Sequence, residues 1–243
     1  MNDNLFKGTV EKKHMAAKTL HAVVEQVRDD APSIYTLFLK PEEKVSCEPG
    51  QFFFIYNEEA GKIHAKAYSL ANAPEEEVLE FCIKRVENGF MSNRLYHLQK
   101  GERMKISGPY GFFTLHPVER DVVFVATGTG ISALRPMMHR IFQEGTERQV
   151  TLIFGVRTQQ DILYRKEWEK LERKNSNFRF LPVLSKEVWE GERGYVQDTL
   201  LRQWKDDERD FYICGLFPMV DAVKKLLLER GIDARRIHAE RYV

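Results

Sequence analysis

The stretch VVFVATGTGI at residues 122–131 decides how the second half of this 243-residue chain folds. Its first five residues form an apolar run typical of a buried strand, and Gly128 and Gly130 follow closely. Glycines let the backbone turn tightly, and a helix that starts there offers unpaired N–H groups to a pyrophosphate. Ala133 stands where the full fingerprint for dinucleotides has a third glycine. The stretch therefore predicts a strand, a phosphate-binding turn and a helix; the alternative is the same turn without a ligand.

Strands and helices alternate on the C-terminal side of this stretch. We predict strands over residues 121–126, 150–156, 178–184, 210–214 and 237–240, and helices over residues 131–142, 162–173, 196–204 and 217–230. Such alternation predicts an α/β domain with a parallel sheet built from βαβ units.

The N-terminal side has a different pattern, with short strands separated by turn residues. We predict strands over residues 20–27, 34–39, 51–56, 65–70, 78–86 and 103–107, and one helix over residues 91–98. Many short strands with turn signals favour an antiparallel barrel or sandwich. The expected organisation is a loose arm over residues 1–16, a β-barrel domain over 17–116 and the α/β domain over 117–243.

Charge and composition exclude several classes of protein. The chain has 37 Lys and Arg against 36 Asp and Glu, so no overall field favours nucleic acid or an anionic membrane. No apolar run approaches the roughly 20 residues that a membrane-spanning helix needs, and the first residues lack a signal-peptide pattern. We expect a cytoplasmic protein that neither binds nucleic acid nor inserts into a membrane; the oligomeric state stays open.

The three cysteines, Cys47, Cys82 and Cys214, are widely separated. An odd number at wide spacing argues against a disulfide framework. An iron–sulfur cluster normally takes four thiolates, so we expect no metal site and place any such cluster in a partner protein.

Two tracts of the N-terminal half carry candidate binding residues. In the tract KAYS, residues 66–69, Lys66 and Tyr68 share one face of a strand, where they can neutralise a phosphate and stack on an aromatic ligand, while Ser69 points the other way. In the tract GFMS, residues 89–92, a glycine and a hydroxyl open a helix, which makes a second anion site. The alternatives are an exposed strand with a surface lysine, and a serine that only caps its helix.

Two C-terminal features point to the carboxyl edge of the sheet. Cys214 and Gly215 end a predicted strand, where ligands of open α/β sheets bind, although most free cysteines are simply buried. Glu240 and Tyr242 lie at the end of the last strand and can cover a flat ring there; the alternative is a strand end with no role in binding.

Together these motifs resemble the ferredoxin–NAD(P)+ reductase superfamily, over nearly the whole chain from about residue 17. Lys66 stands where that family has arginine, Ala133 where it often has proline, and the chain is similar to bacterial members without a fused iron–sulfur domain. The resemblance implies that FAD binds to Lys66, Ala67, Tyr68, Ser69, Gly89, Met91, Ser92 and Tyr242. It implies that the nicotinamide nucleotide binds to Thr127, Gly128, Thr129, Gly130, Arg157, Asp161, Cys214 and Gly215.

The resemblance also implies the activity. A hydride from NADH or NADPH would reduce FAD, which would pass single electrons to a separate ferredoxin or oxygenase component. Ser69, Cys214 and Glu240 are the implied catalytic residues, and Tyr242 resembles the aromatic residue that fills the nicotinamide position. Asp161 favours NADH because a carboxylate repels a 2′-phosphate, whereas Arg157 favours NADPH; we expect NADH to be preferred.

Two other functions fit the same motifs. One is a flavin reductase that uses flavin as a substrate and releases it. The other is a subunit without catalysis of its own that delivers electrons within a larger complex. Retained flavin that NAD(P)H reduces would distinguish the first hypothesis from both.

Overall fold

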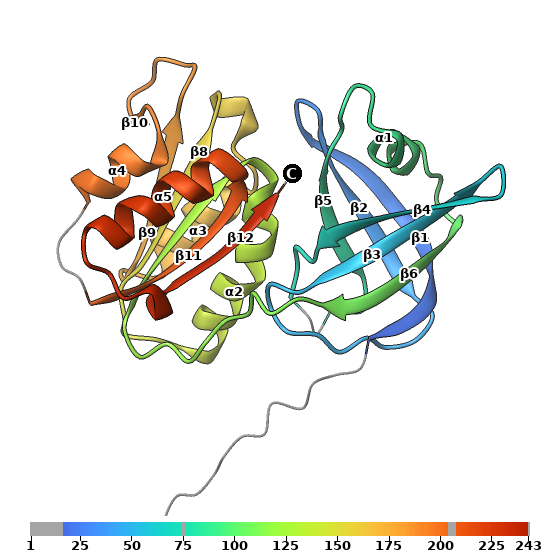
Figure 1. The fold of residues 1–243 in the computed structure, drawn as a ribbon, viewed down its shortest axis with the longest axis horizontal. Helices are drawn as coiled ribbons and strands as arrows, with labels where there is room; N and C mark the ends of the chain where they lie inside the picture. Colours follow the sequence, from blue (N-terminus) through green and yellow to red (C-terminus); the bar gives the residue numbers. More distant parts are fainter. Residues whose placement is uncertain (1–16, 74–75, 204–207, 243) are drawn as a thin grey trace, which may run out of the picture.

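A computed structural model describes residues 17–73, 76–203 and 208–242, which form two β-sheets placed side by side (Figure 1). The arm predicted over residues 1–16 lies outside the described residues. Each sheet has six strands, in the order β4-β3-β6-β1-β2-β5 for the first and β10-β9-β8-β7-β11-β12 for the second. The predicted order of an antiparallel domain followed by a parallel α/β domain is confirmed.

All strand pairs of the first sheet are antiparallel. Its elements are β1 (Lys18–Ala31), β2 (Ile34–Pro41), β3 (Phe52–Glu59), β4 (Lys62–Ser69), β5 (Leu79–Lys84), α1 (Phe90–Tyr96) and β6 (Arg103–Tyr110). Alternate residues such as Phe53 and Ile55 are fully buried, because successive side chains of a strand point to opposite faces. The end strands β4 and β5 approach each other, so the sheet curls around this core into a barrel-like shape.

Strands β3 and β4 form a hairpin with a two-residue turn at Ala60 and Gly61. Both residues have positive φ, 49° and 72°, as the favoured two-residue hairpin turns require. The hairpin makes β4, which carries the tract 66–69, an edge strand whose middle residues are exposed. This tract is therefore available to a ligand.

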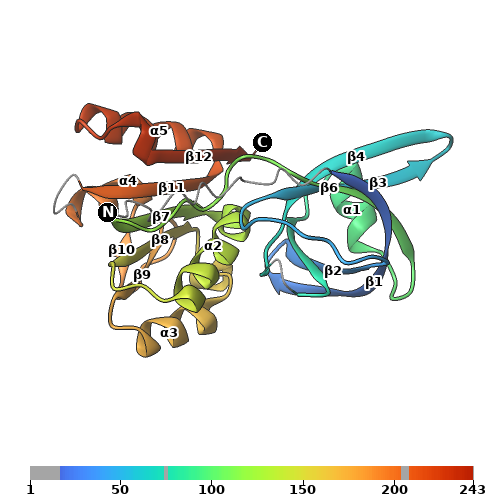
Figure 2. The same ribbon diagram turned by 90° about the horizontal axis from the view of Figure 1, so that it is seen from below.

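All strands of the second sheet are parallel, and helices cover both of its faces (Figure 2). Its elements are β7 (Asp121–Thr127), α2 (Ile131–Glu144), β8 (Val150–Val156), α3 (Arg165–Lys174), β9 (Phe178–Leu184), β10 (Glu192–Arg193), α4 (Val196–Arg202), β11 (Arg209–Leu216), α5 (Phe217–Glu229) and β12 (Ile237–Tyr242). Figure 2 shows α2 and α3 on one face and α4 and α5 on the other. Phe124 packs with the α2 side and Val125 with the α5 side, which explains the unbroken apolar run of β7.

The two domains share a hydrophobic core. Ala71, Cys82 and Phe113 of the N-terminal half belong to the same buried cluster as Met137 of α2. A Cβ on Gly50 would lie 2.3 Å from the Cε of Met137, so the surfaces meet at very close range there. Residues 111–120 connect β6 to β7 across this interface.

The predicted element bounds are wrong in several places. The helix expected over residues 162–173 starts only at Arg165, because Tyr164 has a left-handed φ of 56° and Ile162 is extended. The helix expected over residues 91–98 is Phe90–Tyr96, and the strand expected over 78–86 is shorter, Leu79–Lys84. The helix expected over 196–204 ends at Arg202, its last predicted residue lying outside the described part, and β10 is not predicted at all. Over the described residues, none of the helices combines the length and the apolar character that crossing a bilayer requires.

Candidate functional site

The glycine turn after β7 lies directly beside the end of β11. Residues Gly128–Gly130 form a single 3-10 turn between β7 and α2, as the sequence predicts for a strand–turn–helix unit. A Cβ on Gly130 would lie 2.3 Å from the carbonyl oxygen of Cys214, so only glycine permits this approach. Gly128 has a φ of +53° and open space where a Cβ would point. The turn thus packs against Cys214 on one side and is open on the other.

Strand β11 is held to this turn by Thr127 and Gly215. The hydroxyl of Thr127 accepts a 3.2 Å hydrogen bond from the backbone N–H of Leu216. A Cβ on Gly215, whose φ is +149°, would lie 2.2 Å from that same hydroxyl. The ends of β7 and β11 are therefore fixed together at the carboxyl edge of the sheet, where open α/β sheets bind ligands.

Ser69, Glu240 and Tyr242 meet at this edge although Ser69 belongs to the other domain. The hydroxyl of Tyr242 donates a 2.7 Å hydrogen bond to the Oγ of Ser69, which in turn donates to the Oε1 of Glu240 at 3.4 Å. Glu240 is paired in register with Cys214 on the neighbouring strand β11. The structure thus brings together, in one cluster, the three residues for which the family resemblance implies a catalytic role.

Burial sets the protonation of this cluster. It raises the pKa of Glu240 to about 7, although the hydrogen bond from Ser69 acts in the opposite direction. Burial also raises the pKa of the Cys214 thiol well above its ordinary value, and the nearby carboxylate of Glu240 adds to that effect. At neutral pH the thiol is therefore protonated, and Glu240 is present in both its protonated and its ionised form.

The FAD tract on β4 has one exposed part and one buried part. Lys66 and Ala67 are exposed, Tyr68 is half-buried against the barrel core, and Ser69 is buried. Lys66 lies opposite Ile55 and Ser69 opposite Phe52 on β3, so the tract occupies the half of the hairpin farthest from its turn. A lysine charge and a tyrosine ring on one strand, with a hydroxyl at the strand end, fit the phosphate and rings of a flavin nucleotide.

At the second predicted anion site, Ser92 does not cap the helix as the alternative interpretation supposed. Gly89, not Ser92, is the residue before helix α1. The Oγ of Ser92 donates to the carbonyl of Gly89 at 3.2 Å and accepts from the N–H of Val86 at 3.1 Å. A Cβ on Gly89 would lie 2.7 Å from this Oγ. Ser92 therefore shapes the loop before α1, and the first backbone N–H groups of the helix, at Met91 among others, are the donors suited to a phosphate.

Two carboxylates lie beside the loop that follows β8, which carries the predicted nucleotide-binding residues Arg157 and Asp161. The Oδ2 of Asp161 accepts hydrogen bonds from the backbone N–H and the hydroxyl of Thr158, both at 2.9 Å, and so closes its own turn. Glu187, which follows β9, accepts from the N–H of Gln159 at 2.8 Å and from its side-chain amide at 2.7 Å. Arg157 is exposed in the same loop. Both signs of charge are therefore present beside this loop.

Three further residues at the site were not predicted from the sequence: Glu187, Ser132 and Arg135. The hydroxyl of Ser132 lies 3.4 Å from that of Tyr242 and donates to the carbonyl of Thr129 at 2.7 Å. Glu187 follows the predicted strand 178–184, so the rule that parallel strands end at one edge could have found it. Ser132 and Arg135 carry no motif signal, because the contact of Ser132 with Tyr242 depends on how α2 packs beside β12, and the bonds of Arg135 to Ala71 and Glu80 depend on how the domains pack.

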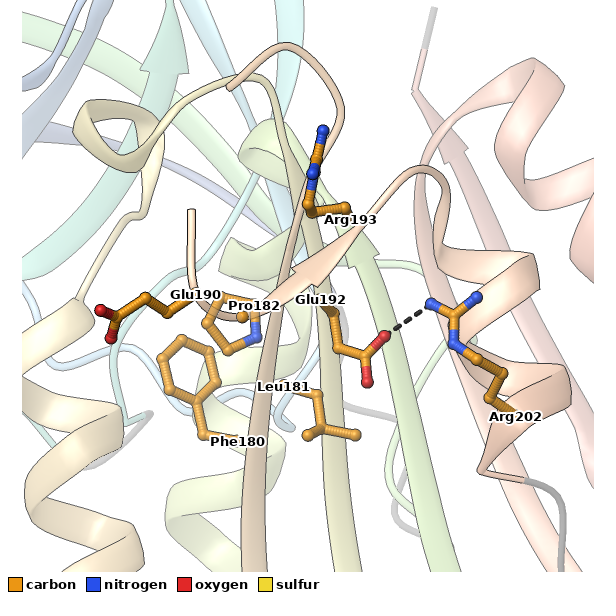
Figure 3. Close-up of a pocket in the computed structure, with 8 residues that line it drawn as sticks. Phe180, Leu181, Pro182, Glu190, Glu192, Arg193 and Arg202 are labelled. Atoms are coloured by element: carbon orange, nitrogen blue, oxygen red, sulfur yellow. Dashed lines mark hydrogen bonds and ion pairs between the residues drawn. The ribbon is translucent and has the colours of Figure 1, made fainter. Parts of the chain in front are cut away.

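A separate cavity of about 560 Å³ lies at the far edge of the second sheet, beside β9 and β10. Figure 3 shows its lining, where Glu192 forms an ion pair with Arg202 and Arg193 points away. None of the predicted site residues lines this cavity. The cluster at the domain interface is therefore the candidate functional site.

Comparison with known families agrees with this geometry. The oxidoreductase FAD-binding domain family matches residues 22–115, and the oxidoreductase NAD-binding domain family matches residues 124–225. The first match contains the tract on β4 and helix α1, and the second contains the glycine turn, Cys214 and most of α5.

Individual proteins match as well. The chain is 36% identical to the anthranilate 1,2-dioxygenase electron transfer component of Acinetobacter baylyi, over 73% of this chain and 53% of that protein. It is 35% identical to ferredoxin–NADP reductase B of Sorangium cellulosum, over 73% of this chain and 78% of that one. The crystal structure of the cytochrome P450 reductase GcoB of Amycolatopsis superposes with a TM-score of 0.87 at 29% identity, covering 93% of this chain and 70% of that chain. The chain thus spans about half the length of the Acinetobacter relative.

Proposed function

Because this chain belongs to the ferredoxin–NAD(P)+ reductase superfamily, with its FAD-binding and NAD-binding oxidoreductase domains, we propose that it transfers electrons from NAD(P)H through FAD to a separate carrier protein. The observation that carries this proposal is the meeting of Ser69 with Glu240 and Tyr242, which joins the two domains at one point. A reductase of this type needs both nucleotide sites to open on the same place.

The residues fit the two cofactors. Lys66, Tyr68 and the N-terminal end of α1 would hold FAD, and the open side of Gly128 with the end of β11 would hold the nicotinamide nucleotide. When bound, FAD supplies the chemistry that accepts two electrons as a hydride and passes them on one at a time. The protein contributes binding, orientation and proton positions.

The cluster residues have separate tasks in this proposal. Ser69 presents a hydroxyl at the strand end, and its proton is directed toward Glu240. Glu240, with a pKa near 7, can hold or release a proton at that hydroxyl. Cys214 offers a small neutral thiol at the end of β11, and Tyr242 covers the site from the last strand.

NADH is the proposed donor, and Glu187 supports this preference, while Asp161 closes the turn beside it. Both oxygens of Glu187 accept bonds from Gln159, which keeps the pKa of its carboxyl low and its charge in place. A fixed negative charge beside the loop disfavours a 2′-phosphate. The separate carrier is proposed to be a ferredoxin or an oxygenase component, and a cytoplasmic location stays part of the proposal.

Anaerobic stopped-flow spectroscopy tests this function. The purified protein, reconstituted with FAD and passed over a gel-filtration column, should retain flavin absorbance that NADH bleaches faster than NADPH. Reduction of an added ferredoxin should follow. Flavin that is lost on the column but used in turnover would indicate a flavin reductase instead. Retained flavin that neither nucleotide bleaches would reject catalysis of this kind.

A further inference from the structure

A largely buried arginine, Arg135, connects the two domains close to the cluster. Arg135 lies in the second turn of α2, the helix that begins at the glycine turn. Only 13% of its side chain is exposed. Its guanidinium has bonding partners in both domains, so it is placed to fix one relative to the other.

On the side of the first domain, Arg135 binds the chain just beyond Ser69. Its Nη1 donates to the carbonyl of Ala71 at 2.8 Å and to the Oε2 of Glu80 on β5 at 3.0 Å. The N–H of Ala71 donates in turn to the carbonyl of Glu80 at 2.8 Å. Ala71 is thus held from both sides, only two residues after Ser69.

On the side of the second domain, the same guanidinium is held by α3. Its Nε and Nη2 donate to the two oxygens of Glu167 at 2.8 to 3.1 Å, and its Cζ lies 4.4 Å above the ring of Tyr164. His139 contacts the same carboxylate at 2.6 Å. This two-point pairing fixes the plane of the guanidinium, which a lysine could not do.

The charges are balanced in a way that keeps this group ionised. Desolvation acts to lower the pKa of Arg135, but the hydrogen bonds and charge of Glu167, with Tyr164 and Glu80, together raise it. Replacing the arginine would leave Glu80 and Glu167 partly buried without their shared cation, which is costly in a low-dielectric interface.

We propose that Arg135 is a positioning residue for hydride transfer: it couples the helix after the nucleotide turn to the end of the flavin strand. Ser132, three residues earlier on α2, lies beside Tyr242, while Arg135 holds Ala71 beyond Ser69. One helix therefore contacts Tyr242 directly and holds the chain two residues beyond Ser69, its partner in the hydrogen bond. This inference rests on the proposed function, because the distance it sets is that between the two cofactor sites.

The test compares Arg135→Gln, Arg135→Lys and Glu80→Gln with Arg140→Gln, a control on the same helix whose ion pair with Glu144 lies within α2. In single-turnover reduction by NADH, Arg135→Gln should lower the limiting rate about tenfold, because small misplacements of reacting groups are costly. The apparent Kd for NADH should change less than twofold. The limiting rates of Arg135→Lys and Glu80→Gln should lie between those of Arg135→Gln and the wild type. The limiting rate of Arg140→Gln should equal that of the wild type.

A second readout needs no flavin. In the apoprotein, amide hydrogen exchange of peptides covering residues 70–72 should be faster in Arg135→Gln and Glu80→Gln than in Arg140→Gln. Unchanged limiting rates in both Arg135→Gln and Glu80→Gln, or equal losses in Arg140→Gln, would overturn the proposal. So would unchanged exchange. If the wild type itself is not reduced by NADH, the proposed function fails, whereas the exchange experiment still reports on the connection between the domains.

Discussion

The phenolic hydroxyl of Tyr242 donates a 2.7 Å hydrogen bond to the hydroxyl of Ser69, which lies 173 positions earlier in the chain. This bond links the last strand of one domain to the edge strand of the other. Because Tyr242 is paired in register beside β11, two residues beyond the pair of Glu240 and Cys214, it covers the place where a nicotinamide ring is proposed to bind. The coenzyme would have to displace it.

Replacing Tyr242 with phenylalanine should therefore tighten the binding of NADH. The substitution keeps the ring but removes the hydrogen bond, which is worth about 1 kcal/mol to the covered arrangement. That corresponds to a roughly fivefold lower Kd, measured by titrating the oxidised holoprotein with NAD+ or a non-reducing analogue of NADH. Tyr96→Phe, which removes a hydroxyl bonded to Asp29 in the first domain, is the control. Unchanged or weaker binding in Tyr242→Phe would contradict the covering role.

Glu240 should make the stability of the protein depend on pH. Its pKa is about 7 in the folded protein, above the ordinary 4.5, so the folded state binds a proton that the unfolded state releases between these values. The stability gained from this proton is fully present below about pH 4.5 and is lost as the pH rises through 7. Glu240→Gln cannot titrate at this position. The unfolding free energy of the wild type should therefore fall relative to that of the variant as the pH rises from 5 to 8. Urea unfolding at four pH values measures the difference, and two parallel curves would rule out a raised pKa.

Local patterns made most of the fold predictable, whereas contacts between domains did not follow from them. The stretch 122–131 combines a buried strand with a glycine turn, and both features depend only on neighbouring residues. Because the carboxyl ends of parallel strands lie at the same edge of a sheet, Cys214 is then expected beside that turn. By contrast, the bond between Ser69 and Tyr242 depends on how two separately patterned domains pack, and no periodicity encodes that.

The wrong helix start at residue 162 has the same cause. Tyr164 adopts a left-handed conformation that a bulky residue seldom takes, and its ring lies under Arg135 at the domain interface. Tertiary packing thus overrides the helical pattern of residues 162–164. Likewise, the bonds of Ser92 to Gly89 and Val86 depend on the loop before α1, which the motif alone does not describe.

Lys66 should control how tightly FAD is retained. It is exposed on the edge strand β4, where its single positive charge is proposed to bind the pyrophosphate of FAD. Lys66→Ala should raise the Kd for FAD about tenfold, since a hydrogen bond to a charged group is worth about 1.5–3 kcal/mol. Lys66→Arg should lower it, because a guanidinium can donate two parallel bonds to a phosphate. Fluorescence titration of the apoprotein measures both. Lys62→Ala, an exposed lysine on the same strand, should have no effect; an equal loss there would indicate a general charge effect instead.

Of the two carboxylates beside the loop after β8, Glu187 should select the coenzyme and Asp161 should hold the loop. Both oxygens of Glu187 accept bonds from Gln159, yet its carboxylate stays at the surface of the loop, so Glu187→Gln removes a fixed charge with little loss of packing. We expect the ratio of kcat/KM for NADH to that for NADPH to fall about fivefold, which corresponds to about 1 kcal/mol of lost repulsion. Asp161 instead closes the turn through Thr158, so Asp161→Ala should lower the unfolding free energy by about 1 kcal/mol, as loss of a cap does. Steady-state kinetics with both coenzymes and urea unfolding of each variant distinguish the roles. A changed coenzyme ratio in Asp161→Ala at unchanged stability would reverse the assignment.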